Sequence, residues 1–253
     1  MGFFEADWMI DDTRKLHKAL RCIDKLNDQS KLKRAVLEAP RHEVRAAAMT
    51  KISDQAILSE LAKDMPLSEV RRQATTKLTN QELLVDIAQN ETNVAVRTAA
   101  IETLTDQSAL CRVAVSEKEK DLVLLAIDKL AEIPENQATF AELVKTHEDW
   151  KIRYKAAQKL EDQTLAQEVF SEVVRYEELG DKKRKKLVKR LTNQDALAYV
   201  AKLPTTLSKN VWEMREIALE RISDRAILAD VAKNASEEAI RNAAAKKLNA
   251  LMN

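Results

Sequence analysis

Glycine is almost absent from this chain, which has Gly2 and Gly180 alone among 253 residues. Tight β-hairpin turns and glycine-rich phosphate loops need glycine at fixed positions, so folds and sites built on them are excluded. The two cysteines, Cys22 and Cys111, are far apart, which argues against a disulfide framework and predicts a reducing compartment. No apolar run reaches the length that spans a bilayer, about 18 to 20 residues. We therefore expect a cytoplasmic protein with no membrane contact.

No sign of charge dominates either, because 42 Lys and Arg residues balance 41 Asp and Glu residues and leave a net charge of +1. This balance provides no global field for nucleic acids or membranes, so such binding would need a local patch. The histidines His17, His42 and His147 show no metal-ligand spacing, and dinucleotide fingerprints, P-loops and nucleophile elbows are missing. The sequence therefore predicts no metal and no cofactor, and it favours a protein that is not an enzyme.

What the sequence does contain is an internal repeat, marked by an Asp or Asn followed by Gln. The pairs are Asp28-Gln29, Asp54-Gln55, Asn80-Gln81, Asp106-Gln107, Asn136-Gln137, Asp162-Gln163 and Asn193-Gln194, with Asp224-Arg225 as an imperfect eighth copy. The first four are spaced by 26 residues, and the later gaps are 30, 26, 31 and 31. A fixed period of this length indicates a helical repeat protein.

Each repeat predicts two helices. Apolar residues three, six and seven positions after each Gln share one helical face, and the preceding Asp or Asn is a good N-cap for this first helix. The second helix has the pattern apolar-Arg-x-x-Ala-x-x-Lys-Leu, as in Val70 to Leu78. The small Ala lets neighbouring helices approach closely. Two helices cannot bury their own apolar faces, so the repeats are expected to stack.

The Val-Arg-x-x-Ala segments resemble those of HEAT and armadillo-type α-solenoids, over residues 15–253. The period is shorter than the roughly 40 residues of HEAT repeats, and in this it resembles the leucine-rich-variant class. The resemblance implies an all-α fold, a right-handed α-solenoid of about eight two-helix HEAT-like repeats. We expect residues 1–253 to form a single domain. In it, residues 1–26 are an N-terminal cap and half repeat, residues 27–248 are the repeats, and residues 249–253 are a C-terminal tail.

Two ladders of basic residues run through the second helices. The first comprises Arg45, Arg71, Arg97, Arg153, Arg184, Arg215 and Arg241; the second comprises Lys25, Lys51, Lys77, Lys129, Lys159, Arg190, Arg221 and Lys247. The resemblance to HEAT repeats implies that the Arg ladder is structural, bonded to a carboxylate or carbonyl of a neighbouring repeat. The alternative is a row of anion-binding groups. The second ladder lies in the last helical turn, where the helix dipole favours a cation.

The repeat becomes irregular after about residue 130. Insertions occur at 131–134, at Tyr176–Gly180 and at Leu203–Ser208, and the last two are expected to project on the same edge because both lie between paired helices. Residues 9–139 contain no aromatic side chain, whereas Trp150 and Trp212 each stand three positions before a ladder arginine. Between them, Lys182 to Arg190 contains seven basic residues in nine. Phe140 and Phe170 fall on core positions, and Phe3, Phe4 and Trp8 are expected to cap the first repeat.

These irregularities predict where binding takes place. The candidate site residues are Trp150, Arg153, Tyr154, Lys182, Lys183, Arg184, Trp212 and Arg215. Aromatic rings beside arginine are frequent interface anchors, so the leading hypothesis is a scaffold that binds a protein or peptide on its concave face. The alternative is nucleic-acid binding, with the Lys182–Arg190 cluster on phosphates and the aromatic rings on bases. HEAT-like DNA glycosylases resemble the chain in repeat type, which implies base-excision activity in that alternative, although no catalytic Asp can be aligned.

Overall fold

The computed structural model describes residue 9, residues 15–204 and residues 211–252. The regular elements of this described part are helices, with no strand, so the prediction of an all-α fold is confirmed. Phe3, Phe4 and Trp8, with the capping role expected for them, lie outside it. The chain divides into two compact units, Met1–Ala131 (unit 1) and Glu132–Asn253 (unit 2).

The described part of unit 1 contains one single helix followed by four helix pairs. Its helices are α1 (Leu16–Lys25), α2 (Gln29–Glu38), α3 (His42–Lys51), α4 (Gln55–Asp64), α5 (Ser68–Thr75), α6 (Gln81–Asn90), α7 (Val94–Thr103), α8 (Gln107–Ser116) and α9 (Lys120–Lys129). The pairs α2–α3, α4–α5, α6–α7 and α8–α9 each pack together. We call the first helix of a pair its A helix and the second its B helix, and α1 packs on α3 as a B helix would.

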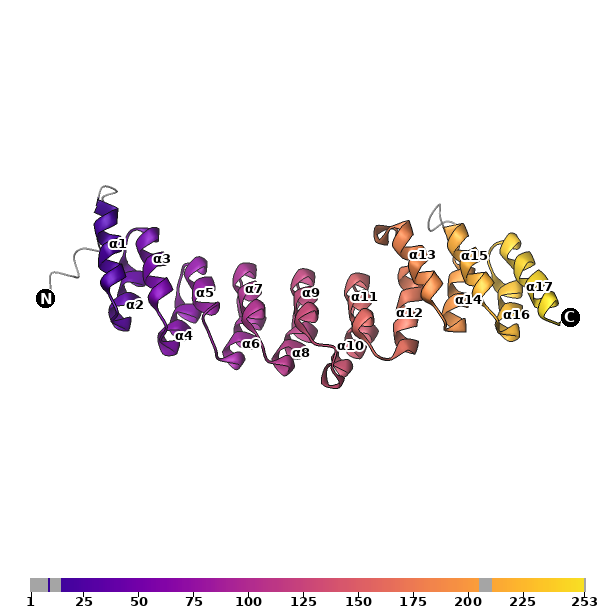
Figure 1. The fold of residues 1–253 in the computed structure, drawn as a ribbon, viewed down its shortest axis with the longest axis horizontal. Coiled ribbons are helices and arrows are strands. Elements are labelled where there is room, and N and C mark those ends of the chain that lie inside the picture. The colour runs from indigo at the N-terminus through magenta and orange to yellow at the C-terminus, as the bar shows by residue number, and fades with distance from the viewer. Residues whose placement is uncertain (1–8, 10–14, 205–210, 253) are drawn as a thin grey trace. The chain divides into compact units, whose positions relative to one another are not determined.

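Unit 2 contains four further pairs. Its helices are α10 (Pro134–Thr146), α11 (Trp150–Lys159), α12 (Gln163–Val173), α13 (Asp181–Arg190), α14 (Gln194–Lys202), α15 (Val211–Arg221), α16 (Arg225–Asn234) and α17 (Glu238–Met252), with the short 3-10 helix η2 (Glu177–Leu179) before α13. Within each unit, helices from successive repeats pack on one another, as Figure 1 shows. The described part of the chain thus holds the eight repeats that the motif count predicts. Residues 249–252, expected as a tail, continue α17.

Most A helices begin as predicted. The capping side chains accept hydrogen bonds from backbone N–H groups of the first turn, which have no partner inside the helix. The caps are Asp28, Asp54, Asn80, Asp106, Asp162, Asn193 and Asp224. The prediction is wrong for Asn136, because α10 starts earlier, with Pro134 in its first turn and Ile133 as its N-cap. Proline suits the first helical position because its missing N–H is not needed there.

The glutamine of each motif joins its repeat to the next one. Gln81 accepts hydrogen bonds through Oε1 from the backbone N–H groups of Thr105 and Asp106, at 2.8 and 2.9 Å. Residue pairs joined in the same way, glutamine first, are Gln29 and Ser53, Gln55 and Thr79, Gln107 and Ala131, Gln137 and Glu161, and Gln194 and Ser223. We call this contact the glutamine bridge. It satisfies backbone donors at the point where the next A helix begins.

The second basic ladder also joins repeats. Several of its side chains donate to backbone carbonyls at the C-terminal end of the preceding B helix, and these carbonyls have no N–H donor within that helix. Lys77, for example, donates to the carbonyls of Met49 and Thr50 at 3.0 and 2.7 Å. The same contact is made by Lys51, Lys129, Arg221 and Lys247. The ladder is therefore structural at these positions, and it stabilises the end of the preceding helix as well as its own.

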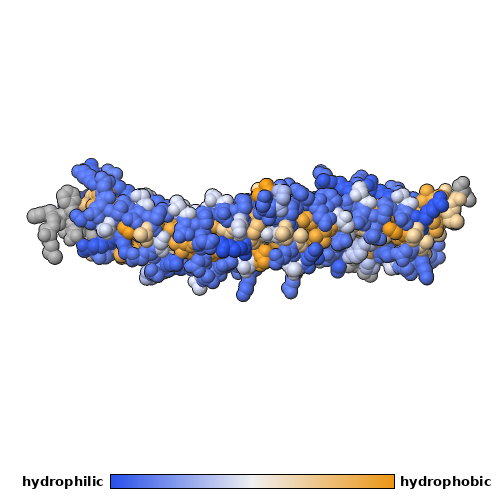
Figure 2. Space-filling view, turned by 90° about the horizontal axis from the view of Figure 1, so that it is seen from below, coloured by the Kyte–Doolittle hydropathy of each residue, from blue (hydrophilic) through white to orange (hydrophobic). Residues whose placement is uncertain are grey.

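Burial follows the repeat. The predicted apolar positions form the core, and the alanine of the B-helix pattern is fully buried in seven repeats, at Ala48, Ala74, Ala100, Ala126, Ala156, Ala218 and Ala244. Seen from the side of the A helices, the surface is mainly hydrophilic, and hydrophobic residues show only in patches (Figure 2). In the described residues, no helix is long and apolar enough to cross a membrane.

The sixth repeat, α12–α13, departs from this plan. Leu187 takes the place of the buried alanine, and an exposed Lys183 takes the place of a buried apolar residue. Here α11 packs extensively on α12, a contact between a B helix and the following A helix that is weak or absent elsewhere. The glutamine bridge moves by one helical turn as well. Gln167, rather than Gln163, accepts from the backbone N–H groups of Thr192 and Asn193 at 2.7 and 2.6 Å.

Replacing Gln81 with Ala removes a bridge and leaves backbone N–H groups of the next repeat without an acceptor. Because these donors are exposed and water can replace the acceptor, we expect Gln81→Ala to lower the free energy of unfolding by about 0.5–1.5 kcal/mol, measured by urea titration. Gln163→Ala is the matched control, because the Gln163 amide donates only to carbonyls of Leu160 and Glu161 beside its own helix. Its effect should stay within about 0.5 kcal/mol. Equal losses in the two variants would contradict the assignment of the bridge.

Candidate functional site

The Arg ladder is engaged in structural contacts in the regular repeats. Arg45, Arg71, Arg97 and Arg241 each donate to two backbone carbonyls in the loop that follows the A helix of their own repeat. Three ladder members also pair with a glutamate of the next repeat: Arg71 with Glu91, Arg97 with Glu117, and Arg153 with Glu172. Arg71, Arg97 and Arg153 are therefore neutralised by a neighbouring repeat, as the structural interpretation of the ladder expects. The carbonyl contacts of Arg45 and Arg241 lie within their own repeats instead.

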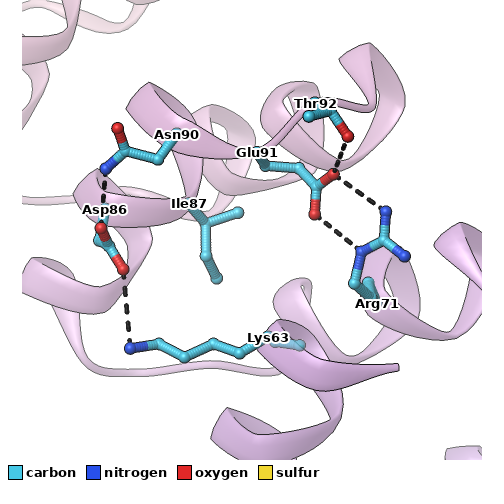
Figure 3. A pocket seen from close by; sticks show the side chains of 8 residues that line it. Lys63, Arg71, Asp86, Ile87, Asn90, Glu91 and Thr92 are labelled. Carbon is cyan, nitrogen blue, oxygen red and sulfur yellow. Dashed lines mark hydrogen bonds and ion pairs between the residues drawn. The ribbon is translucent and has the colours of Figure 1, made fainter. Parts of the chain in front are cut away.

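Figure 3 shows this arrangement in a hollow of about 330 Å³ beside α4 and α6. Arg71 donates from Nε and Nη2 to the two carboxylate oxygens of Glu91, at 2.8 and 2.9 Å. Because both partners are largely buried and bonded in parallel, the pair is stronger than a surface ion pair. The hydrogen bond from Arg71, with smaller contributions from Asn93 and Thr92, lowers the pKa of Glu91 to about 2. The hollow therefore offers no unpaired cation to an anionic ligand.

Trp150 and Arg153 lie at the start of α11 and meet the Tyr176–Gly180 insertion. The rings of Trp150 and Tyr176 stack with centroids 4.8 Å apart and planes 7° from parallel. Arg153 donates to both carboxylate oxygens of Glu172 at 2.7 Å. Gly180, the residue before α13, has φ of +76°, a conformation that a side chain would strain. The insertion therefore places a second aromatic ring on Trp150, an arrangement that the sequence pattern did not predict.

Trp212 and Arg215 form a second group at the start of α15. The Trp212 side chain is 39% exposed, and the Arg215 guanidinium lies over its ring, 5.8 Å from the centroid. Arg215 itself is fully buried. It donates from Nε to the carbonyl of Ala201 at 3.4 Å, and its Nη1 is 4.0 Å from Glu237. Neither terminal nitrogen has a hydrogen-bond partner among the described residues, and burial lowers the pKa of Arg215.

The basic cluster on α13 divides between the interior and the surface. Arg184 is buried and pairs with Asp181, whereas Lys185 pairs with Glu213 of α15. Lys182 and Lys183 are exposed, and so are Lys186, Lys189 and Arg190. The side chains of these five make no hydrogen bond or ion pair within the described part of the chain. Of the predicted site residues, Lys182 and Lys183 thus present charge to solvent, while Arg153, Arg184 and Arg215 do not.

Tyr154, the remaining predicted residue, points elsewhere. It packs edge-to-face against Phe170 of α12, with ring centroids 5.9 Å apart, and lines a cavity of about 310 Å³ between α11, α12 and α13. Gln158, Gln163, Gln167 and Arg190 line the same cavity. The sequence pattern did not predict that these polar residues line one cavity. The sequence does contain a sign of it, because Leu187 replaces the alanine of the repeat.

Cys22 and Cys111 form no disulfide, and no group of residues suited to hold a metal ion occurs in the described ranges. Phe140 is fully buried as expected, whereas Phe170 is only partly buried and forms part of the cavity wall. In the Leu203–Ser208 insertion, residues 205–208 lie outside the described residues. The expected common edge of the two insertions therefore stays a prediction.

Comparison with known proteins does not place the chain in a family. No protein-family model and no curated protein matches the chain. Among solved structures, the chain is similar to one from "Computational Design of Self-Assembling Cyclic Protein Homooligomers", with 17% sequence identity and a TM-score of 0.14. The match covers 98% of this chain and 90% of that chain. A TM-score this low carries no argument about fold or function, so the functional case rests on the geometry of the chain itself.

The lowered pKa of Glu91 predicts a pH dependence. Its carboxylate is ionised in the folded protein down to a pH of about 2, whereas the ordinary value is 4.5. The pair with Arg71 therefore stabilises the fold above pH 4.5, and this stabilisation is lost as the pH falls toward 2. We expect Glu91→Gln to cost about 2–3 kcal/mol at neutral pH and nothing near pH 2, measured by urea titration across pH. Glu82→Gln, which breaks an exposed pair with Arg112, should cost under about 0.5 kcal/mol throughout.

The burial of Arg215 predicts that its charge does not stabilise the fold. A buried cation with incompletely bonded nitrogens is replaced by an apolar side chain of similar size at little cost. We expect Arg215→Met to leave the free energy of unfolding within about 1 kcal/mol of the native value, or to raise it. Arg97→Met is the matched ladder variant. It leaves the buried Glu117 carboxylate unpaired and should cost about 2–4 kcal/mol. A comparable loss in Arg215→Met would show that its contacts are stabilising.

Proposed function

We propose that this chain is a non-enzymatic interaction scaffold that binds an acidic protein or peptide segment along the B helices α11, α13 and α15. In this proposal the repeats form a right-handed, HEAT-like α-solenoid, and these three helices lie on its concave face. The observation that carries the proposal is the set of exposed lysines on α13, in the row that runs from Trp150 to Trp212. Figure 1 allows α11, α13 and α15 to be followed in order within unit 2.

The charge of α13 supports an acidic partner. Its ten residues contain seven cations and one acid, Asp181, which pairs with Arg184. Lys182, Lys183, Lys186 and Lys189 are exposed and have no partner in the described part of the chain. Like charges this close repel one another, so a helix gains stability when an acidic segment binds across it. Electrostatic attraction of this kind speeds association and selects partners by charge.

The two tryptophans supply the apolar contact that a specific partner needs. Trp150 is held by its stack on Tyr176, and Trp212 lies on the Arg215 guanidinium. Side chains ordered in this way lose little conformational entropy on binding, and tryptophan is enriched among residues that dominate interface energies. Both stand at the N-terminal ends of their helices, as Lys182 and Lys183 do on α13. The expected partner therefore carries acidic residues flanked by apolar ones.

The same lysines would serve nucleic-acid binding, the alternative function. Stacking on a base requires an accessible ring face. The Trp150 ring has Tyr176 stacked on it and the Lys151 ammonium 5.5 Å from its centroid, and the Trp212 ring has Arg215 over it. These contacts reduce the ring surface on which a base could stack, while the exposed part of Trp212 remains available for apolar contact. The geometry therefore favours a protein segment over bases, and no residue of the row is assigned a catalytic role.

Selection of short random peptides on the immobilised chain tests this proposal. We expect the selected peptides to be acidic with aromatic or aliphatic residues, and to bind the double variant Lys182→Glu, Lys183→Glu at least about tenfold more weakly, measured by fluorescence anisotropy. Trp212→Ala should weaken them as well. The charge-matched control is Lys31→Glu, Lys118→Glu, which changes two exposed lysines of unit 1 and should leave the affinity unchanged.

Two outcomes would overturn the proposal. One is a set of peptides without acidic residues, or with equal affinity for the Lys182 and Lys183 double variant and its control. The other is tight binding of labelled single-stranded DNA, lost in the same double variant, with a logarithmic salt slope close to the number of phosphates contacted. That result would establish the nucleic-acid alternative.

A further inference from the structure

The sixth repeat contains a cavity that lies between its two helices and α11. In the other repeats an alanine on the B helix is fully buried, and its small size allows close packing. Leu187 occupies this place on α13 and lines the cavity. In this repeat α13 packs less closely on α12 than the other B helices do on their A helices, whereas α11 packs on α12 and α13 packs on α15. The volume left between the three helices is about 310 Å³, which falls at the lower end of the range for small-molecule sites.

The walls of this cavity are chemically mixed. Tyr154 and Phe170 form an edge-to-face aromatic pair on one side, and Leu160 and Leu187 add apolar surface. Edge-to-face geometry leaves aromatic surface available to a further planar ring. A site built in this way, with apolar walls and a few polar groups, is typical of those that bind small organic molecules.

The polar lining combines amides with one cation. Gln158 and Gln163 offer side-chain amide groups, which heteroaromatic rings can pair with, and the Gln163 Oε1 accepts no hydrogen bond from the described residues. The Gln167 amide is already bonded to Thr192 and Asn193. Gln163 has been released from the glutamine bridge by the one-turn shift, because Gln167 makes that contact in its place. No carboxylate is among the described residues that line the cavity, so a negatively charged ligand meets no like charge there.

Arg190 is the cation of the cavity and lacks the carbonyl contact that five members of its ladder make. Lys51, Lys77, Lys129, Arg221 and Lys247 donate to carbonyls of the preceding B helix. Arg190 makes no such bond with the described residues and lines the cavity instead. Burial raises the pKa of Tyr154, opposed by its hydrogen bond with Gln158 and by the charge of Arg190. Tyr154 thus keeps its proton as a hydrogen-bond donor beside the guanidinium.

We propose that this cavity binds a small planar aromatic molecule that carries one anionic group. The ring lies against Tyr154 and Phe170, its polar edge meets the glutamine amides, and the anionic group pairs with Arg190. Guanidinium binds carboxylate and phosphate in the same two-bond geometry, so aromatic carboxylates and nucleoside monophosphates share the required chemistry. This inference does not depend on the proposed partner surface, which uses the lysines of α13 and the two tryptophans.

Isothermal titration calorimetry with defined probes tests the inference on the full chain. The probes are indole-3-carboxylate and adenosine monophosphate. Two controls are used: adenosine, which lacks the anionic group, and inorganic phosphate, which lacks the ring. We expect one or both of the ring-bearing anions to bind, at least about tenfold more tightly than adenosine or phosphate. Binding of indole-3-carboxylate alone indicates an aromatic carboxylate as the ligand, and binding of adenosine monophosphate alone indicates a nucleoside monophosphate.

Variants locate the site. Arg190→Gln should lower the affinity for the probe at least about tenfold, and Tyr154→Ala should lower it as well. Lys189→Gln is the matched control, because it removes one charge from the neighbouring exposed position and does not line the cavity. Circular dichroism and the urea midpoint establish that each variant is folded. The inference is overturned if neither anionic probe binds, or if Lys189→Gln weakens binding as much as Arg190→Gln.

Discussion

The side-chain amide oxygen of a glutamine in one repeat accepts hydrogen bonds from backbone N–H groups where the next repeat begins. The packing of each unit depends on this contact. The first N–H groups of a helix have no partner within it, and an unpaired buried donor is costly. In the regular repeats the capping Asp or Asn satisfies some of these groups from within the repeat, while the glutamine bridge satisfies others from the repeat before. Each repeat therefore completes the start of its neighbour, which accounts for stability gained through nearest-neighbour contacts.

The basic ladders provide further contacts of this kind, at the C-terminal ends of helices and in the loops between them. Lys77 and its equivalents bond the terminal carbonyls of the preceding B helix, and Arg71 joins its own loop to Glu91 of the next repeat. Most of the charged residues that recur with the repeat are thus used inside the protein. Charge available to a partner must then come from residues outside the pattern, and the exposed lysines of α13 are the clearest such group.

Much of the fold could be predicted from the sequence because the repeat imposes local rules. The Asp-Gln pairs predicted the A helices and their caps, and failed at Asn136 because Pro134 starts α10 earlier. The structural role of the glutamine could not be predicted. In the sequence, a Gln that bonds the next repeat cannot be distinguished from an exposed Gln. The site was predicted less well. Trp150 and Arg153 turned out to contact Tyr176 and Glu172 of a neighbouring helix and insertion, whose geometry no periodicity describes.

The central claim is that the glutamine bridge positions each following repeat, and that in the sixth repeat it has moved by one turn. Hydrogen exchange at the backbone amides of Thr192 and Asn193 tests it most directly. These amides donate to Gln167, so Gln167→Ala should lower their protection at least about tenfold, which corresponds to about 1.4 kcal/mol. Gln163→Ala should leave it unchanged. Loss of protection in Gln163→Ala, or in neither variant, would contradict the account.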